Sequence, residues 1–411
     1  MYNVFFFLIV AIIIIGHLSG LYLDYLNNKM WSDTVPEKLR GIIDKDRYKT
    51  SQSYYRINNK FSNISSSFFL VIILVMIFLG GFAWIDQLAR SITENRILVC
   101  IIFFGIIGLA SDLLSLPFSW YDTFKIEEKF GFNKTSKATF ILDHIKSWLL
   151  AIILGAPVLA LITWIYYSAG EMFWIYIWVV ITLFSLFMNM FYSELIVPIF
   201  NKQKPLEEGE LRTEIEKMAA EAGFRLSNIY TIDGSRRSTK ANAYFAGLGP
   251  KKRIVLFDTL IDDLSVEEIT AVLAHEIGHY KKKHSLTMLL YGILQTGIML
   301  YIFSLLANNE KLTIAMGAEI PSFHISLLAF VLIYSPVSRV ISLFMNYLSR
   351  KHEYEADVYA KNIYDGKYLL SALKKLSLKN LSNLNPHPAY VFVHYSHPPL
   401  LKRIDNIESK T

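Results

Sequence analysis

The stretch AVLAHEIGHYKKKH, at residues 271–284, decides how the rest of the chain is interpreted. His275 and His279 are four residues apart, so an α-helix places both imidazoles on one face, one turn apart. Zn²⁺ accepts two such nitrogens at about 2.0–2.1 Å without bending the backbone. Glu276 projects beside them, where its carboxylate can take a proton from water at the metal. The stretch therefore matches the H-E-x-x-H arrangement of zinc proteases.

The residues before this stretch favour a helix. Ser265 and Glu268 are three residues apart and predict a capping box at the helix start. Ile269, Val272 and Leu273 then supply an apolar face. Taken alone, a five-letter motif can also match by chance, and two helical histidines can be ordinary surface residues. Features elsewhere in the chain are needed to distinguish a zinc site from a chance match.

The composition indicates a membrane protein. Hydrophobic residues make up 53% of the 411 residues and charged residues 18%, with a mean hydropathy of +0.35, which is too apolar for a soluble globule. The net charge of +6 is modest, so we expect Lys and Arg to set membrane orientation, and we expect no nucleic-acid partner. The single Cys100 lies in an apolar run, which excludes a disulfide framework and a cysteine metal site.

Apolar runs long enough to cross a hydrocarbon core of about 30 Å recur along the chain. They predict seven membrane-spanning helices, at 4–23, 67–85, 97–118, 148–167, 173–192, 286–306 and 325–347. The first run has no positive segment before it and no small-residue cleavage site before Asp24, which predicts a retained span rather than a signal peptide. We therefore expect an all-α polytopic membrane protein, with about seven transmembrane helices and a small α+β insert.

The distribution of Lys and Arg predicts the orientation of these helices. The loops at 29–60 and 125–146 are rich in Lys and Arg. The connections that alternate with them, at 90–96, 168–171 and 307–323, contain few of either residue. The N-terminus is therefore expected outside the cell or in a lumen, with the insert and the tail in the cytoplasm. The expected parts are helices one to five at 1–192, the insert carrying HEIGH at 193–285, helices six and seven at 286–347, and the tail at 348–411.

The insert has the pattern of a small α+β unit. An amphipathic run at 207–222 predicts a helix that ends at Gly223. Three short β-like runs follow, at 228–232, 243–245 and 253–257, separated by turns at 233–234 and 247–250.

A catalytic zinc site needs a third protein ligand besides the two histidines. His284 lies about 180° around a continuous helix from His275, so one helix cannot bring all three imidazoles together. After the seventh span, Glu353 and Asp357 are again i and i+4 on one face, while Glu355 points elsewhere. Glu353 as third ligand, with Asp357 bonding a ligand histidine, meets what zinc sites require. A solvated charged helix at the membrane surface explains this spacing equally well.

Further segments carry motifs in a recognisable order. They are IEEKFGFNKTS at 126–136, PIFNKQKPLEEGEL at 198–211, DGSRRSTKANAYFAG at 233–247, KRIVLFDTL at 252–260, SRKHEYEADVYA at 349–360 and HYSHPPLLKRI at 394–404. Together with the HEIGH stretch, they resemble the type I CAAX prenyl proteases, integral-membrane zinc endopeptidases of the a-factor-converting and prelamin-processing type. The resemblance covers most of the chain from about residue 117 onward, whereas the first two spans match in hydropathy alone.

The resemblance implies a gluzincin-like site with one Zn²⁺ per chain. Its ligands would be His275, His279 and Glu353. Glu276 would act as the general base, and Asp357 would support the ligands.

Four further residues acquire roles through the resemblance. Asn242 and Ala243 correspond to a strand edge that pairs with an extended substrate, although an ordinary internal strand needs no ligand to explain it. His397 and Arg403 lie in the tail motif and by resemblance help to hold the scissile carbonyl or its oxyanion. The alternative for both is an ordinary place at a lipid headgroup surface.

The function implied by the resemblance is hydrolysis of peptide bonds in CAAX tails that bear an isoprenoid, with membrane lipids as further partners. One alternative is quality control of membrane proteins without prenyl specificity. Another is a non-catalytic zinc-binding scaffold or transporter, against which the intact Glu276 argues. The end of the sequence, IESKT, has no retention signal of the KDEL kind. We expect a bacterial inner membrane first, and the endoplasmic reticulum membrane if the source is eukaryotic.

Overall fold

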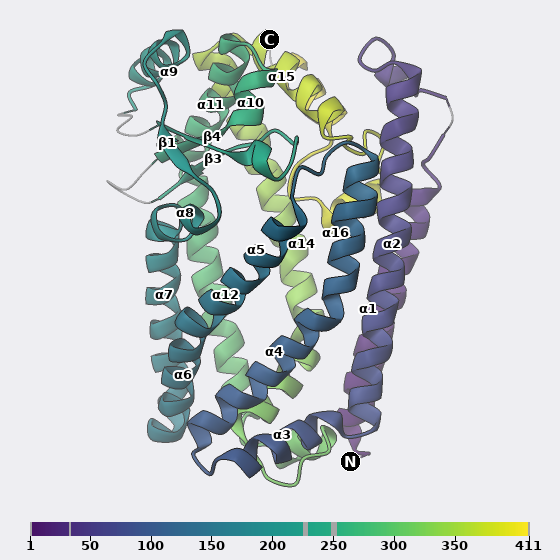
Figure 1. Ribbon diagram of the computed structural model, residues 1–411, viewed down its shortest axis with the longest axis vertical. Coiled ribbons are helices and arrows are strands. Elements are labelled where there is room, and N and C mark those ends of the chain that lie inside the picture. Colours follow the sequence, from purple (N-terminus) through teal and green to yellow (C-terminus); the bar gives the residue numbers. More distant parts are fainter. Residues whose placement is uncertain (1, 33, 225–228, 248–252, 410–411) are drawn as a thin grey trace.

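The computed structural model describes residues 2–32, 34–224, 229–247 and 253–409, and most of them are helical (Figure 1). Within these ranges, seven helices are long and apolar enough to cross a membrane, which confirms the predicted fold class and number of spans. They are α1 (Val4–Asn28), α2 (Lys45–Phe78), α4 (Arg96–Tyr121) with η2 (Asp122–Glu127), α5 (Lys137–Leu150) with η3 (Ala151–Gly155) and α6 (Ala156–Ser168), η4 (Gly170–Met172) with α7 (Phe173–Leu195) and α8 (Val197–Phe200), α12 (His284–Leu306), and α14 (Phe323–Ile363).

The observed helices extend beyond the predicted spans. α2 begins at Lys45 rather than at 67, and α14 has 41 residues, a length of about 60 Å. Both continue past a hydrocarbon core of about 30 Å into polar sequence, where a hydropathy window detects no span. The polar extension of α14 carries the Glu353 motif away from the membrane.

The predicted end of the second span, at residue 85, is wrong. α2 ends at Phe78, and Gly80 adopts a left-handed conformation with φ 67° that breaks the helix. The apolar residues that follow belong to a separate helix, α3 (Gly81–Ile92). The short helices η1 (Glu37–Leu39) and α13 (Glu310–Ala315) lie between long helices, and three more follow α14 in the tail: α15 (Gly366–Lys379), α16 (Pro388–His394) and α17 (Leu400–Ser409).

Most helices of the insert, together with the tail helix α15, lie at one end of the molecule. In Figure 1, α9 (Glu210–Glu221), α10 (Asp258–Asp263), α11 (Val266–Lys281) and α15 lie at the end that holds the C-terminus. The N-terminus and α3 lie at the opposite end. α14 packs against α11, α15 and α17, so the helix that leaves the seventh span reaches the HEIGH helix.

A four-stranded sheet completes the insert, in the order β1-β2-β4-β3. The three predicted strands are confirmed as β2 (Ile229–Ile232), β3 (Ala243–Ala246) and β4 (Arg253–Phe257), and the predicted helix at 207–222 is α9. β1 (Gln203–Pro205) has no signal in the sequence, because three residues ending in proline carry no alternating pattern. η5 (Gly234–Arg236) occupies the predicted turn at 233–234, whereas Asn228 and residues 248–250 lie outside the described residues.

β2 and β4 are parallel, and the two outer pairs are antiparallel. In the described part of the chain β3 pairs with β4 alone, so its other edge has free backbone groups.

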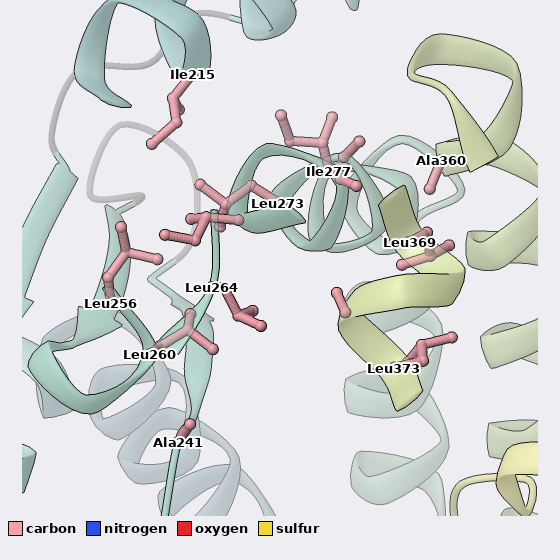
Figure 2. Packing of buried hydrophobic residues seen from close by; sticks show 14 of the residues in the cluster. Ile215, Ala241, Leu256, Leu260, Leu264, Leu273, Ile277, Ala360, Leu369 and Leu373 are labelled. Atoms are coloured by element: carbon pink, nitrogen blue, oxygen red, sulfur yellow. The ribbon is translucent and has the colours of Figure 1, made fainter. Parts of the chain in front are cut away.

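A hydrophobic cluster holds α11 against its neighbours (Figure 2). Leu273 and Ile277 of α11 are fully buried, and they lie in one cluster with Ile215 of α9, Leu256 of β4 and Leu369 of α15. Burial of each such side chain stabilises the fold by about 1.5–3 kcal/mol relative to exposure. The HEIGH helix is therefore a core element with a fixed position, not a surface helix.

Gly278 allows α11 to approach α14 closely. A Cβ atom at this position would lie 3.2 Å from the carbonyl oxygen of Ala356 and 3.1 Å from Cδ1 of Tyr359. These contacts lie next to His279 on one helix and three residues after Glu353 on the other. The close approach therefore brings the two motifs together.

Candidate metal centre and active site

The HEIGH helix begins as its sequence predicts. The Ser265 hydroxyl accepts a hydrogen bond from the Glu268 amide at 3.3 Å, and Glu268 Oε2 accepts one from the Ser265 amide at 2.9 Å. This capping box fixes the start of the helix ten residues before the first histidine. His275 and His279 then share one face, with their Nε2 atoms 3.1 Å apart.

Glu353 of α14 completes a group of three potential ligands. Its Oε1 lies 3.2 Å from His279 Nε2, and its Oε2 lies 3.4 Å from His275 Nε2. Three donor atoms at about 2.0–2.1 Å from one tetrahedral zinc ion would be roughly 3.3 Å apart. The observed separations are therefore those of ligands around a single small ion.

The carboxylate of Glu353 is also in an environment that suits a cation. The side chain is 5% exposed, and among the described residues Oε2 forms no hydrogen bond, although it lies 3.4 Å from the guanidinium of Arg403. A buried carboxylate oxygen without a hydrogen bond is costly, and a metal ion would satisfy it. His275, His279 and Glu353 thus fit a metal ion in both chemistry and spacing.

Asp357 lies behind the first histidine. Its Oδ1 accepts a hydrogen bond from His275 Nδ1 at 2.9 Å, and the fully buried carboxylate also accepts two hydrogen bonds from Arg403, at 2.5 and 2.9 Å. Such a partner fixes the tautomer and the ring orientation of a ligand histidine.

Two pKa values report the same network. Burial disfavours protonated His275, yet its hydrogen bonds to Asp357 and Glu353 raise the pKa of the ring to about 9. Burial also opposes the charge on Arg403, but its ion pairs with Asp357 and Glu353 raise the pKa of the guanidinium. The side chains of His275, Asp357, Glu353 and Arg403 therefore form one coupled group at the site.

A cavity of about 410 Å³ opens onto this group. Glu276 lines it beside His275 and Glu353, and Asn242 and Ala243 line it at the start of β3. The structure thus brings the HEIGH glutamate, the candidate ligands His275 and Glu353, and the start of β3 to one cavity.

The two tail residues take different positions in this cavity. His397 is 67% exposed and its Nε2 lies 3.2 Å from Glu353 Oε1, so its ring is free to face a bound molecule. Arg403 is 12% exposed, and its guanidinium is directed at Asp357 and Glu353. The environment of Arg403 suits holding these carboxylates better than contacting a carbonyl oxygen.

Comparison with known proteins identifies the family. Residues 24–202 match the family described as CAAX prenyl protease N-terminal, five membrane helices, and residues 205–411 match Peptidase family M48. The chain belongs to peptidase family M48. This M48 peptidase is therefore a metalloprotease of the membrane that acts on peptide or protein substrates.

The relatives of this M48 peptidase match along almost the whole chain. It is 36% identical to a CAAX prenyl protease 1 homolog from Oryza sativa subsp. japonica, over 97% of this chain and 96% of that protein. It is also 36% identical to CAAX prenyl protease 1 of Saccharomyces cerevisiae, over 94% and 91%. The crystal structure of S. mikatae Ste24p has a TM-score of 0.95 and 34% identity, over 99% of this chain and 100% of that one.

One set of contacts close to β3 has no signal in the sequence of this M48 peptidase. Lys240, two residues before Asn242, donates hydrogen bonds to Glu127 at 2.7 Å and to the Tyr54 hydroxyl at 2.8 Å. These hydrogen bonds connect the segment that precedes β3 with η2 and with α2. The partners are 113 and 186 positions away, and no spacing rule relates residues at that range.

We expect Asp357→Ala to lower the metal affinity of the M48 peptidase by about 10- to 100-fold. The substitution removes the acceptor that orients His275 and one of the two carboxylate partners of Arg403. Zinc retained after dialysis against a graded chelator series measures the change. Asp405→Ala, an exposed carboxylate on α17, serves as the matched control. Equal zinc retention in the two variants would contradict a role for Asp357 at the metal.

Proposed function

We propose that this M48 peptidase is a zinc-dependent endopeptidase that cleaves CAAX-type C-terminal tails bearing an isoprenylated cysteine. The observation that carries the proposal is the set of Nε2 and carboxylate oxygen atoms of His275, His279 and Glu353, spaced 3.1–3.4 Å apart beside Glu276. Relatives named CAAX prenyl protease 1 along almost the whole chain support the substrate class.

His275, His279 and Glu353 would hold the zinc ion, which, when bound, acts as a Lewis acid towards the peptide carbonyl and the attacking water. Glu276 takes the proton of that water as it attacks, and then delivers it to the leaving amine. The exposed ring of His397 donates a hydrogen bond to the oxygen on which negative charge develops. Arg403 acts by holding Asp357 and Glu353.

An extended substrate would add to the free edge of β3. Backbone hydrogen bonds to this strand align a peptide without reading its sequence, and Asn242 and Ala243 place its scissile bond beside Glu276. Further along β3, Tyr244 and Phe245 border a second cavity of about 960 Å³, together with Met188 of α7 and Leu286 of α12. This apolar groove at the membrane helices supports a substrate with an apolar attachment.

Cleavage of a farnesylated CAAX peptide and its unmodified twin tests the proposal. We expect kcat/KM to be at least about tenfold higher for the farnesylated peptide, since burying a few CH₂ groups contributes about 0.8 kcal/mol each. Equal rates would contradict prenyl specificity and favour quality control of membrane proteins. The non-catalytic scaffold or transporter is not favoured, because the chain belongs to a peptidase family and retains Glu276.

We further propose the endoplasmic reticulum as the membrane, with the N-terminus in the lumen and the catalytic end in the cytoplasm. The relatives named above are eukaryotic, which favours this location over the bacterial inner membrane. The excess of Lys and Arg in residues 29–60 and 125–146 supports the orientation.

A further inference from the structure

The second histidine of the HEIGH motif has a partner on the side away from Glu353. His279 Nε2 faces His275 and Glu353, while its Nδ1 lies 3.1 Å from Nδ1 of His284. The other nitrogen of His284, Nε2, lies 3.0 Å from Glu355 Oε2. His284 is 5% exposed, so its ring is buried between these two groups.

One arrangement of protons satisfies all of these contacts. A ligand imidazole binds metal through an unprotonated nitrogen, so His279 with Nε2 at the metal carries its proton on Nδ1. That N–H donates to His284 Nδ1, which must then be the acceptor. The proton of His284 is consequently on Nε2, where it is donated to the carboxylate of Glu355.

The fold holds His284 in this position. α11 ends at Lys281, and Lys283 adopts a left-handed conformation with φ 60°, so α12 starts in a new direction. The ring of His284 then stacks on His352 of α14, with the ring centroids 4.0 Å apart and the planes within 8° of parallel. The ring can neither tilt nor flip without losing the stack or a hydrogen bond.

We infer that His284, held by Glu355 and His352, is a positioning residue that fixes the tautomer and orientation of His279. This inference rests on the proposed zinc site. His284 orients His279 as Asp357, held by Arg403, orients His275. The acceptor for His279 is a neutral imidazole, which in turn donates to the carboxylate of Glu355. His284 itself does not bind the metal, because both of its nitrogens are engaged.

Zinc affinity by chelator competition, together with the absorption spectrum of the Co²⁺-substituted protein, tests the inference on the full-length chain in detergent. We expect His284→Leu to lower zinc affinity by about 10- to 100-fold and to alter the cobalt spectrum. His284→Asn keeps an acceptor near the position of Nδ1, so it should restore most of the affinity. Glu355→Leu, at a side chain that is 40% exposed, should lower affinity by about 3- to 10-fold.

Lys351→Ala is the matched control, because Lys351 is 61% exposed and lies 3.8 Å from Glu355 without touching His284. Wild-type zinc affinity and cobalt spectrum in both His284→Leu and Glu355→Leu would overturn the inference. A His279→Ala variant separates this result from failure of the zinc site itself. Loss of zinc in His279→Ala with full retention in the other two refutes the positioning role alone, whereas retention in His279→Ala refutes the zinc site.

Discussion

Glu276→Gln is expected to lower kcat/KM for peptide cleavage by about 10²–10⁴-fold while one zinc ion per chain remains bound. Glutamine keeps the volume of the side chain in the cavity but cannot accept the proton of the attacking water. The three candidate ligands are untouched, so the metal site stays intact. Cleavage of a fluorogenic CAAX peptide and the zinc content of the same sample, measured by elemental analysis, check the two halves of this expectation.

The control for this variant is Glu267→Gln, which removes a carboxylate from the first turn of the same helix, away from the metal. It should cleave at close to the wild-type rate. If Glu276→Gln retained full activity, Glu276 would not be the general base. If the variant also lost its zinc, the defect would lie in the metal site, and the proposed proton transfer would have no support from the experiment.

Glu353→Ala is expected to reduce zinc affinity by at least about 100-fold and to abolish cleavage. The substitution removes the acidic ligand of the three, and a ligand contributes more to metal binding than the residues that orient it. Glu353 is 5% exposed beside Arg403, so the substitution leaves a buried site without its acidic ligand. Chelator competition on the purified protein measures the affinity, and the peptide assay measures the activity.

Asp405→Ala offers a charge-matched control at an exposed carboxylate on α17. It removes the same charge but leaves the three candidate ligands in place, so its zinc content should stay close to that of the wild type. Undiminished zinc in Glu353→Ala would contradict the assignment of the third ligand.

The parts of the site that are local in sequence could be predicted from it. An α-helix fixes the distance between side chains four residues apart, so the His275–His279 and Glu353–Asp357 pairs each occupy one face of a helix. The capping box at Ser265 depends on three neighbouring positions and forms as predicted. Membrane spans were predictable for a similar reason, because each is a continuous apolar run.

The meeting of α11 with α14 could not be predicted from spacing. It depends on the close approach at Gly278 and Ala356, and on a core to which distant segments contribute. Arg403 reaches His275 across 128 positions of sequence. In the sequence alone, helical spacing and resemblance support Glu353 as a third ligand, and a solvated surface helix explains the spacing equally well.

His284 illustrates a different limit. On one continuous helix through residue 284, His284 would point away from His275. The helix in fact breaks at Lys283, and the break turns His284 back towards His279. A left-handed lysine is rarely predictable from sequence, because non-glycine residues seldom adopt positive φ. His284 is still not expected to be a third ligand. The reason is that its two ring nitrogens contact His279 and Glu355, not that it points away.

A zinc anomalous difference map from crystals of the wild-type protein tests the central claim most directly. We expect a single peak about 2.0–2.2 Å from His275 Nε2, His279 Nε2 and a carboxylate oxygen of Glu353. A peak elsewhere, such as between His284 and Glu355, or a fully loaded site without Glu353, would contradict it.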